Sequence, residues 1–277
     1  MTMTTDEMRA GAWNFFNTAK RFYAWSLSMK ATTFLLGVWT ALAGLAWWIP
    51  VLLLVLSFGA DGLLLMSDNA KGKAEDLMRR LEFWDGFGWP PSERDLRQVP
   101  LIRNRPADSY FASDLTQSPA RAMANLEEQA WWSRELYQRI ENLVLTLLIA
   151  TVGTTIIVLL IVALNGQATT GRRESVRLVI ATLNILLSAG LIKLHIGYRK
   201  AAAAAATAEQ TGDRLKKEYA STPQLSPVEA VRAYHTYQLA RASAPLIPDT
   251  LYKHYRDDLN QRWDRKQGDT VSSSPST

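Results

Sequence analysis

One apolar run, residues 31–66, constrains this chain more than any other feature. A helix rises about 1.5 Å per residue, so one helix over this run would be about 54 Å long, whereas the hydrocarbon of a bilayer is about 30 Å thick. One straight span is therefore too long. Pro50 disfavours a continuous helix, and Trp47 and Trp48 are of the ring type that collects at membrane surfaces. The pattern predicts a helical hairpin with its tip at residues 47–50.

A second apolar block also divides into two parts. Residues 142–164 and 176–198 are each long enough to cross a bilayer, and the stretch between them, NGQATTGRRES, contains the Gly, Asn and Ser of a turn. We therefore expect an all-α integral membrane protein with four transmembrane helices in two hairpins and helical cytoplasmic extensions. The alternative is the buried core of a soluble helical protein, where uncharged runs of this length are uncommon.

A cleaved signal peptide is the alternative for the first span, because Ala41-Leu42-Ala43 follows an apolar stretch as a cleavage site would. The polar region before that stretch is about 30 residues long, which is too long for a signal peptide. It is also rich in aromatic residues and carries Asp6 and Glu7. We therefore expect the span to be retained.

The orientation of the spans follows from lysine and arginine, which are enriched in loops that stay in the cytoplasm. Basic residues flank the spans on the side of the two termini and of the central region, and the first hairpin tip has none; only Arg172 and Arg173 oppose this pattern. We expect a multi-pass protein with both termini cytoplasmic. The predicted domains are an N-terminal amphipathic helix (1–30), the first hairpin (31–66), a central cytoplasmic helical region (67–141), the second hairpin (142–198) and a cytoplasmic helical tail (199–277).

The cytoplasmic segments carry apolar residues at helical spacing, so we expect them to continue the spans as helices. The clearest cases are residues 70–84, 119–141 and 201–218, the last of which opens with six alanines, the strongest helix former. A loop rich in proline and glycine separates the first two.

Composition excludes several classes of chemistry. There is no cysteine, so disulfides and thiolate sites are absent, and the three histidines lie far apart in sequence. The formal net charge of +5 is mild and dispersed, which does not indicate a nucleic-acid groove. No phosphate-binding loop, nucleophile elbow or kinase motif occurs. We expect neither an enzyme nor a cofactor or metal site.

Polar residues within the predicted spans are candidates for a pore or gate. Asp61 is costly in a span unless it has a partner or a wet cavity, and Lys193 lies at matched depth in the fourth span. Asn184, Ser188 and His195 fall on one stripe of that span. The stripe could line an aqueous path, or it could form hydrogen bonds between helices. Asp61 could likewise belong to a gate, to a structural ion pair, or to the interface.

A second set of candidates combines tryptophan with arginine in the central region. Such residues could stack a ligand ring and bind phosphate, or they could form a helical core with a basic rim, which is the more ordinary outcome. The ligand or partner-surface candidates are Arg79, Arg80, Trp84, Trp89, Arg103, Arg105, Trp131 and Trp132.

Two stretches carry a family resemblance. The first is RRLEFWDGFGWPPSERDL, with Glu82, Asp85 and Trp89, and the second is YQLARASAPLIPDTLYKHYRDDLNQRW, in which APLIPDTLY is the nearest match. With two hairpins around a cytoplasmic middle, the chain resembles the SMODS-associated four-transmembrane effectors, a bacterial family of pore-forming proteins in anti-phage defence.

The resemblance implies a protein of the bacterial inner (cell) membrane that disrupts the bilayer when it is activated and thereby causes abortive infection. A homo-oligomer is expected, since four spans enclose no wide path alone. The trigger would be a cyclic oligonucleotide or a partner protein bound by the cytoplasmic region. A non-conducting membrane scaffold or signalling adaptor is the alternative, and a small transporter is less favoured.

Overall fold

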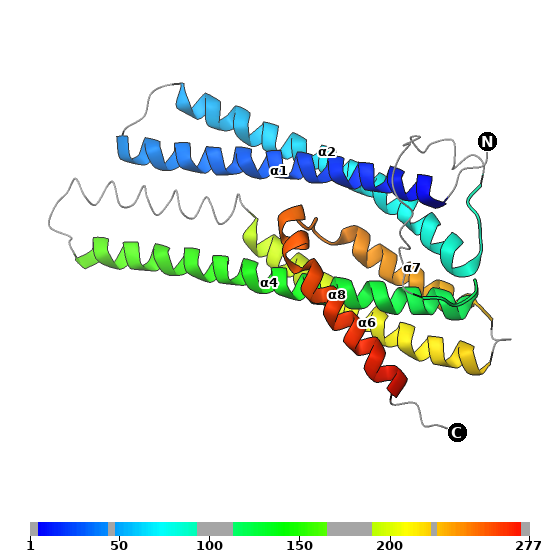
Figure 1. Cartoon of the computed structure of the whole chain (residues 1–277). Helices are drawn as coiled ribbons and strands as arrows, with labels where there is room; N and C mark the ends of the chain where they lie inside the picture. The colour runs from blue at the N-terminus through cyan, green and yellow to red at the C-terminus, as the bar shows by residue number, and fades with distance from the viewer. Residues whose placement is uncertain (1–4, 44–47, 93–112, 165–189, 223–225, 273–277) are drawn as a thin grey trace. The chain divides into compact units, whose positions relative to one another are not determined.

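The computed structural model describes residues 5–43, 48–92, 113–164, 190–222 and 226–272. Every regular element in these ranges is an α-helix, which confirms the predicted all-α class (Figure 1). The helices are α1 (Thr5–Ala43), α2 (Ile49–Phe87), α4 (Pro119–Leu164), α6 (Leu191–Ser221), α7 (Val228–Ser243) and α8 (Asp249–Ser272).

The long apolar run is divided between two helices, as predicted. Helix α1 ends at Ala43 and helix α2 begins at Ile49. Pro50 lies in the first turn of α2, where a missing backbone N–H removes no intrahelical hydrogen bond. Pro50, which disfavours one continuous helix, thus lies at the start of the second helix.

The four longest helices continue past the ends of the predicted spans. The helical segments expected at residues 70–84, 119–141 and 201–218 lie within α2, α4 and α6, so these three predictions are confirmed. The predicted turn of the second hairpin and most of the fourth span lie outside the described residues.

The chain forms two compact units. The first comprises Met1–Asn17, Ala70–Arg139 and Tyr198–Thr277, and the second comprises Thr18–Asn69 and Ile140–Gly197. Helices α1, α2, α4 and α6 each contribute residues to both units, whereas α7 and α8 belong to the first.

The first unit has an apolar core between α2, α4, α6 and α7. Met123, Leu126 and Tyr234 are fully buried in it, together with small residues of the alanine-rich α6. Small residues let the helix backbones approach closely: a Cβ atom at Gly212 of α6 would lie 3.0 Å from the backbone nitrogen of Glu127 on α4. Close packing around the start of α4 therefore positions the polar side chains described below.

In the second unit, α1 and α2 lie antiparallel. The hydroxyl of Ser67 donates to the carbonyl of Ala19, and that of Ser26 donates to the carbonyl of Ala60, each at 2.8 Å. Both serines are buried. Among the described residues, α2 is long and apolar enough to cross a membrane.

Large exposed apolar side chains are concentrated in the second unit. In the described part of the first unit they are limited to Trp89, Leu115, Val228 and Leu239. The second unit exposes such residues along α1, α2 and α4, including Leu54 and Phe58, whose surfaces are 58% and 71% exposed. Soluble monomers rarely expose contiguous apolar surface on this scale.

Candidate functional site

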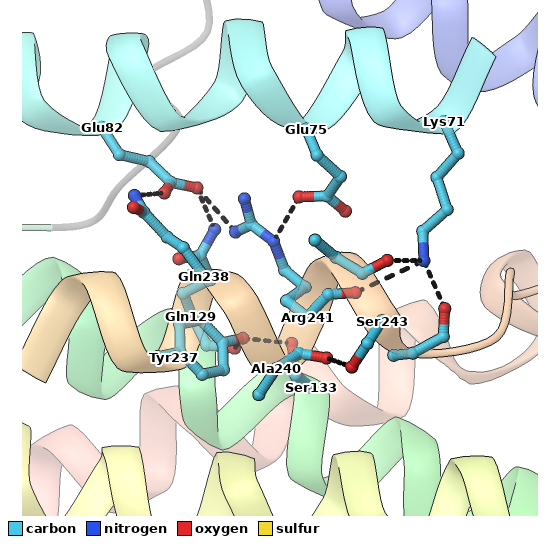
Figure 2. A network of polar contacts seen from close by, with 12 residues as sticks. Lys71, Glu75, Glu82, Gln129, Ser133, Tyr237, Gln238, Ala240, Arg241 and Ser243 are labelled. Atoms are coloured by element: carbon cyan, nitrogen blue, oxygen red, sulfur yellow. Dashed lines mark hydrogen bonds and ion pairs between the residues drawn. The ribbon is translucent and has the colours of Figure 1, made fainter. Parts of the chain in front are cut away.

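One face of α2 in the first unit carries charged side chains into the protein interior. Lys71, Glu75 and Glu82 are spaced by four and seven residues, which places them on the same side of the helix. All three are buried. Figure 2 shows them projecting from α2 toward α7, with α4 contributing further partners.

Arg241 of α7 joins the two carboxylates. Its Nε donates to Glu75 at 2.8 Å and its Nη1 donates to Glu82 at 2.6 Å, and the arginine side chain is only 11% exposed. A buried charge is stable only when it is paired and hydrogen-bonded. Arg241 therefore holds α7 against α2 through two carboxylates that lie two helical turns apart.

Glu82 is the most enclosed member, with no exposed surface. Besides Arg241, it accepts hydrogen bonds from Gln129 of α4 at 2.6 Å and from Gln238 of α7 at 2.7 Å. One carboxylate thus connects three helices. Its two oxygens accept hydrogen bonds from one guanidinium and two amides, and these bonds hold α2, α4 and α7 together.

Lys71 stabilises the C-terminal end of α7. Its ammonium donates to the carbonyl of Ala242 at 2.8 Å, to that of Arg241 at 3.4 Å, and to that of Ala244. The last carbonyls of a helix lack intrahelical donors and carry partial negative charge. A buried cation at this position donates hydrogen bonds to these carbonyls and also offsets their partial negative charge.

Tyr237 extends the network to α4. Its hydroxyl donates to Ser133 Oγ at 2.8 Å and lies 3.3 Å from the carbonyl of Gln129. Burial raises the pKa of Tyr237 to about 12, although the nearby Arg241 and the bond to Ser133 act in the opposite direction. Burial also raises the pKa of Tyr137. Both phenols are therefore neutral at physiological pH.

A second polar cluster lies where α4, α6 and α8 meet. Lys266 of α8 lies 3.1 Å from Glu127 and 2.9 Å from Glu209, while Arg134 lies 2.6 Å from Glu209 and Lys216 pairs with Glu127. Both glutamates are mostly buried. Two acids are thus shared among three cations from three helices.

The end of α2 is held by a third set of contacts. Asp85 accepts from Arg121 at 3.2 Å and from Asn125 at 2.7 Å, both on α4. Gly88 then adopts a positive φ of 75°, which glycine tolerates. The chain turns there, and Trp89 stacks on Phe87 with ring centroids 4.9 Å apart.

These clusters link helices through hydrogen bonds and ion pairs between buried or partly buried side chains. Among the described residues, no group of three or more His, Asp or Glu side chains is arranged to hold a metal ion. The chemistry that the arrangement supports is electrostatic: it fixes the packing of α2, α4, α7 and α8 through charges that must stay paired.

The predicted pore residues lie in the second unit or outside the described residues. Asp61 is 69% exposed at its side chain and pairs with Lys30 of α1 at 3.5 Å. Lys193, the predicted partner, is an exposed residue of α6 and makes no ion pair within the described part of the chain, where Asp61 pairs with Lys30 instead. His195 is partly buried on α6. Asn184 and Ser188 lie outside the described residues.

The predicted tryptophan and arginine candidates do not converge on one place. Trp131 is buried and packs on Trp263 at 5.2 Å and on Trp132 at 6.1 Å. Trp84 packs beside a small core formed by α1 and α2, whereas Trp89 is half exposed.

The arginines of this set are distributed differently. Arg80 pairs with Asp76 on its own helix at 2.7 Å, and Arg79, the preceding residue of α2, is partly buried. Arg103 and Arg105 lie outside the described residues.

Sequence reasoning missed the residues at the centre of the network, above all Arg241, Glu75 and Lys71. A pattern could have indicated them: Ala74, Leu77, Met78 and Leu81 are buried at helical spacing, and the charges at 71, 75 and 82 all fall on the neighbouring face of the helix, next to this apolar face. Charges at core positions demand partners. The partners of these charges lie mainly on α7, much later in the chain, and the sequence of α7 shows no comparable pattern.

No family model, no curated protein and no solved structure matches this chain.

Proposed function

We propose that this chain is a membrane-inserted effector whose second unit lies in the bilayer and whose first unit lies in the cytoplasm. The observation that carries the proposal is the concentration of exposed apolar side chains in the second unit, including the helix α2 that is long enough to cross a membrane. Water would make this surface costly, whereas lipid tails would cover it.

The resemblance to the four-transmembrane defence effectors supplies the activity. In this proposal the protein has four spans with both termini inside, assembles as a homo-oligomer in the bacterial inner membrane, and permeabilises it after its cytoplasmic region binds a cyclic oligonucleotide or a partner protein. Opening requires that this trigger bind the open assembly more tightly than the closed one.

Membrane insertion is tested by introducing a lysine on the exposed apolar face. Leu54→Lys or Phe58→Lys should be nearly neutral if this surface faces water, but each should cost about 2.5–3.5 kcal/mol if it faces hydrocarbon. Leu239→Lys is the matched control, because Leu239 is 53% exposed in the first unit. We expect loss of membrane-inserted protein for the first two variants alone. Equal recovery of all three would contradict insertion of α2.

Topology and activity need separate tests. Reporter fusions at residue 95 and at the C-terminus should both report the cytoplasm, and an external signal at either would contradict the orientation. Purified protein in dye-loaded liposomes should release the dye once it is triggered. If correctly inserted, triggered protein leaves both dye and membrane potential unchanged, the non-conducting scaffold or adaptor is the correct function.

A further inference from the structure

Four residues of α4 form a ridge that faces the C-terminal helix. Glu127, Trp131, Glu135 and Arg139 follow one another at intervals of four residues, which places them along one side of α4. Each contacts a residue of α8, and the order is reversed, so the two helices pack antiparallel along this ridge.

The contacts along the ridge are mainly ionic. Asp258 accepts from Arg139 at 2.6 Å, and Arg139 also lies over the ring of Tyr255. One turn further along α8, Arg262 lies 3.9 Å from Glu135. Lys266 then lies 3.1 Å from Glu127 and, on α6, 2.9 Å from Glu209. Asp258 and Arg262 are about half exposed, so salt can screen them.

The apolar part of this contact is small. Among the α8 residues whose burial the structure describes, only Leu259 and Trp263 are buried. Trp263 packs on Trp131 at 5.2 Å, but its indole N–H has no acceptor within the described residues, which lowers the gain from burying it. Two buried apolar side chains, a few partly buried ones such as Tyr255, and several ion pairs hold a helix of 24 residues.

The segment just before α8 is held much more firmly. Leu246 is buried, its carbonyl accepts a 2.7 Å bond from the Tyr198 hydroxyl, and the carbonyl of Ala244 accepts from Lys71. Ile247 and Pro248 follow directly, and α8 begins at Asp249. Any motion of α8 would therefore pivot at residues 247–248 without disturbing α7.

We propose that α8 is an electrostatic latch: it opens separately from the rest of the first unit, pivots at residues 247–248, and uncovers Trp131 together with the carboxylates of Glu127 and Glu209. This inference goes beyond the proposed function and does not depend on it. Ionic strength, or any cationic ligand that competes for the two carboxylates, shifts the latch toward its open state.

Hydrogen–deuterium exchange of the full-length protein in lipid nanodiscs tests the latch. Raising NaCl from 50 to 500 mM should make amides of residues 249–266 exchange about threefold faster, as expected when the exposed Arg139–Asp258 and Arg262–Glu135 pairs, worth a few tenths of a kcal/mol each, are screened. Residues 228–243 should keep their exchange rate. Lys266→Glu at low salt should reproduce the effect, because it sets a third acid beside Glu127 and Glu209.

Lys253→Glu is the matched control: it makes the same charge change on an exposed residue of α8 that has no ion pair within the described residues. It should leave exchange unchanged. The latch is overturned if residues 249–266 respond neither to salt nor to Lys266→Glu, or if α7 exchanges together with α8 by the same factor. The salt series on the unaltered protein decides the question even if the Lys266 variant does not fold.

Discussion

The guanidinium of Arg241 lies 2.6 Å from a carboxylate oxygen of Glu82, a residue with no exposed surface. The two residues are 159 positions apart in the sequence and lie on different helices, α7 and α2. An ion pair in this environment adds little compared with a well-packed apolar contact, but removal of one partner leaves the other as an uncompensated buried charge. The network is therefore sensitive to single substitutions.

The first prediction follows from this asymmetry. Glu82→Ala should lower the free energy of unfolding by about 1–3 kcal/mol for each of the two buried amides that lose their acceptor, Gln129 and Gln238, while Arg241 keeps Glu75. Asp76→Ala on the same helix removes an exposed acid paired with Arg80 and should cost less than about 1 kcal/mol. Denaturant unfolding in detergent compares the two. If both variants lower the free energy of unfolding by similar amounts, the buried network does not stabilise the fold more than an exposed ion pair does.

Lys71 provides a second prediction. Lys71→Met keeps most of the apolar stem but removes the side-chain donor to the carbonyls of Ala242 and Ala244, while that of Arg241 keeps the N–H of Ala244, so we expect a loss of about 1–3 kcal/mol. The exposed Lys73→Met is the control and should change stability by less than about 1 kcal/mol. Amides near residue 243 should also exchange faster in the Lys71 variant. Unchanged exchange there would contradict the capping role.

The third prediction concerns helix contact. A Cβ atom at Gly86 would lie 2.8 Å from the Cβ and 2.9 Å from the Cα of Ala122, so Gly86→Ala must push α2 away from α4 and should cost about 1–3 kcal/mol. A Cβ atom at Gly72 of the same helix meets nothing within 4 Å. Gly72→Ala should therefore stabilise by up to about 1 kcal/mol through helix propensity. Thermal unfolding of both variants measures the opposite signs.

The fourth prediction is a pH dependence at the alkaline end. Burial raises the pKa of Tyr237 to about 12, above its ordinary value of about 10. A raised pKa in the folded state means that the neutral phenol stabilises the fold below pH 10, and that this stability is lost between about pH 10 and 12. Tyr237→Phe should make the unfolding free energy fall less steeply over this window. A residual fall is expected, because burial also raises the pKa of Tyr137.

Local rules sufficed to predict the helical segments at residues 70–84, 119–141 and 201–218. The position of Pro50 divides the apolar run, and the alanine-rich start of residues 201–218 gives a long helix, as both patterns indicated. Such features depend on neighbouring residues, whose effects on backbone geometry are visible in the sequence itself.

The partners of buried charges could not be predicted in the same way. Glu82 finds Arg241 and Gln238 on a helix that follows much later in the chain, and Trp131 finds Trp263. These choices depend on how helices pack, and packing is fixed by many small contacts together. Matched depth suggested Lys193 for Asp61, but depth does not say which neighbouring helix a side chain faces. The structure places Lys30 there, on the helix antiparallel to α2.

This difference supplies the last prediction. In water a pair as exposed as Lys30 and Asp61 would contribute at most about 1 kcal/mol, whereas a single charge left in hydrocarbon would cost about 2.5–3.5 kcal/mol. If residues 31–66 lie in the bilayer, Lys30→Asp or Asp61→Lys alone should lower the amount of inserted, heat-stable protein, and the two together should restore most of it. The combination of Asp61→Lys with Lys193→Asp is the matched control and should restore none. Rescue by the Lys193 combination would instead show that Asp61 faces the fourth span in the membrane.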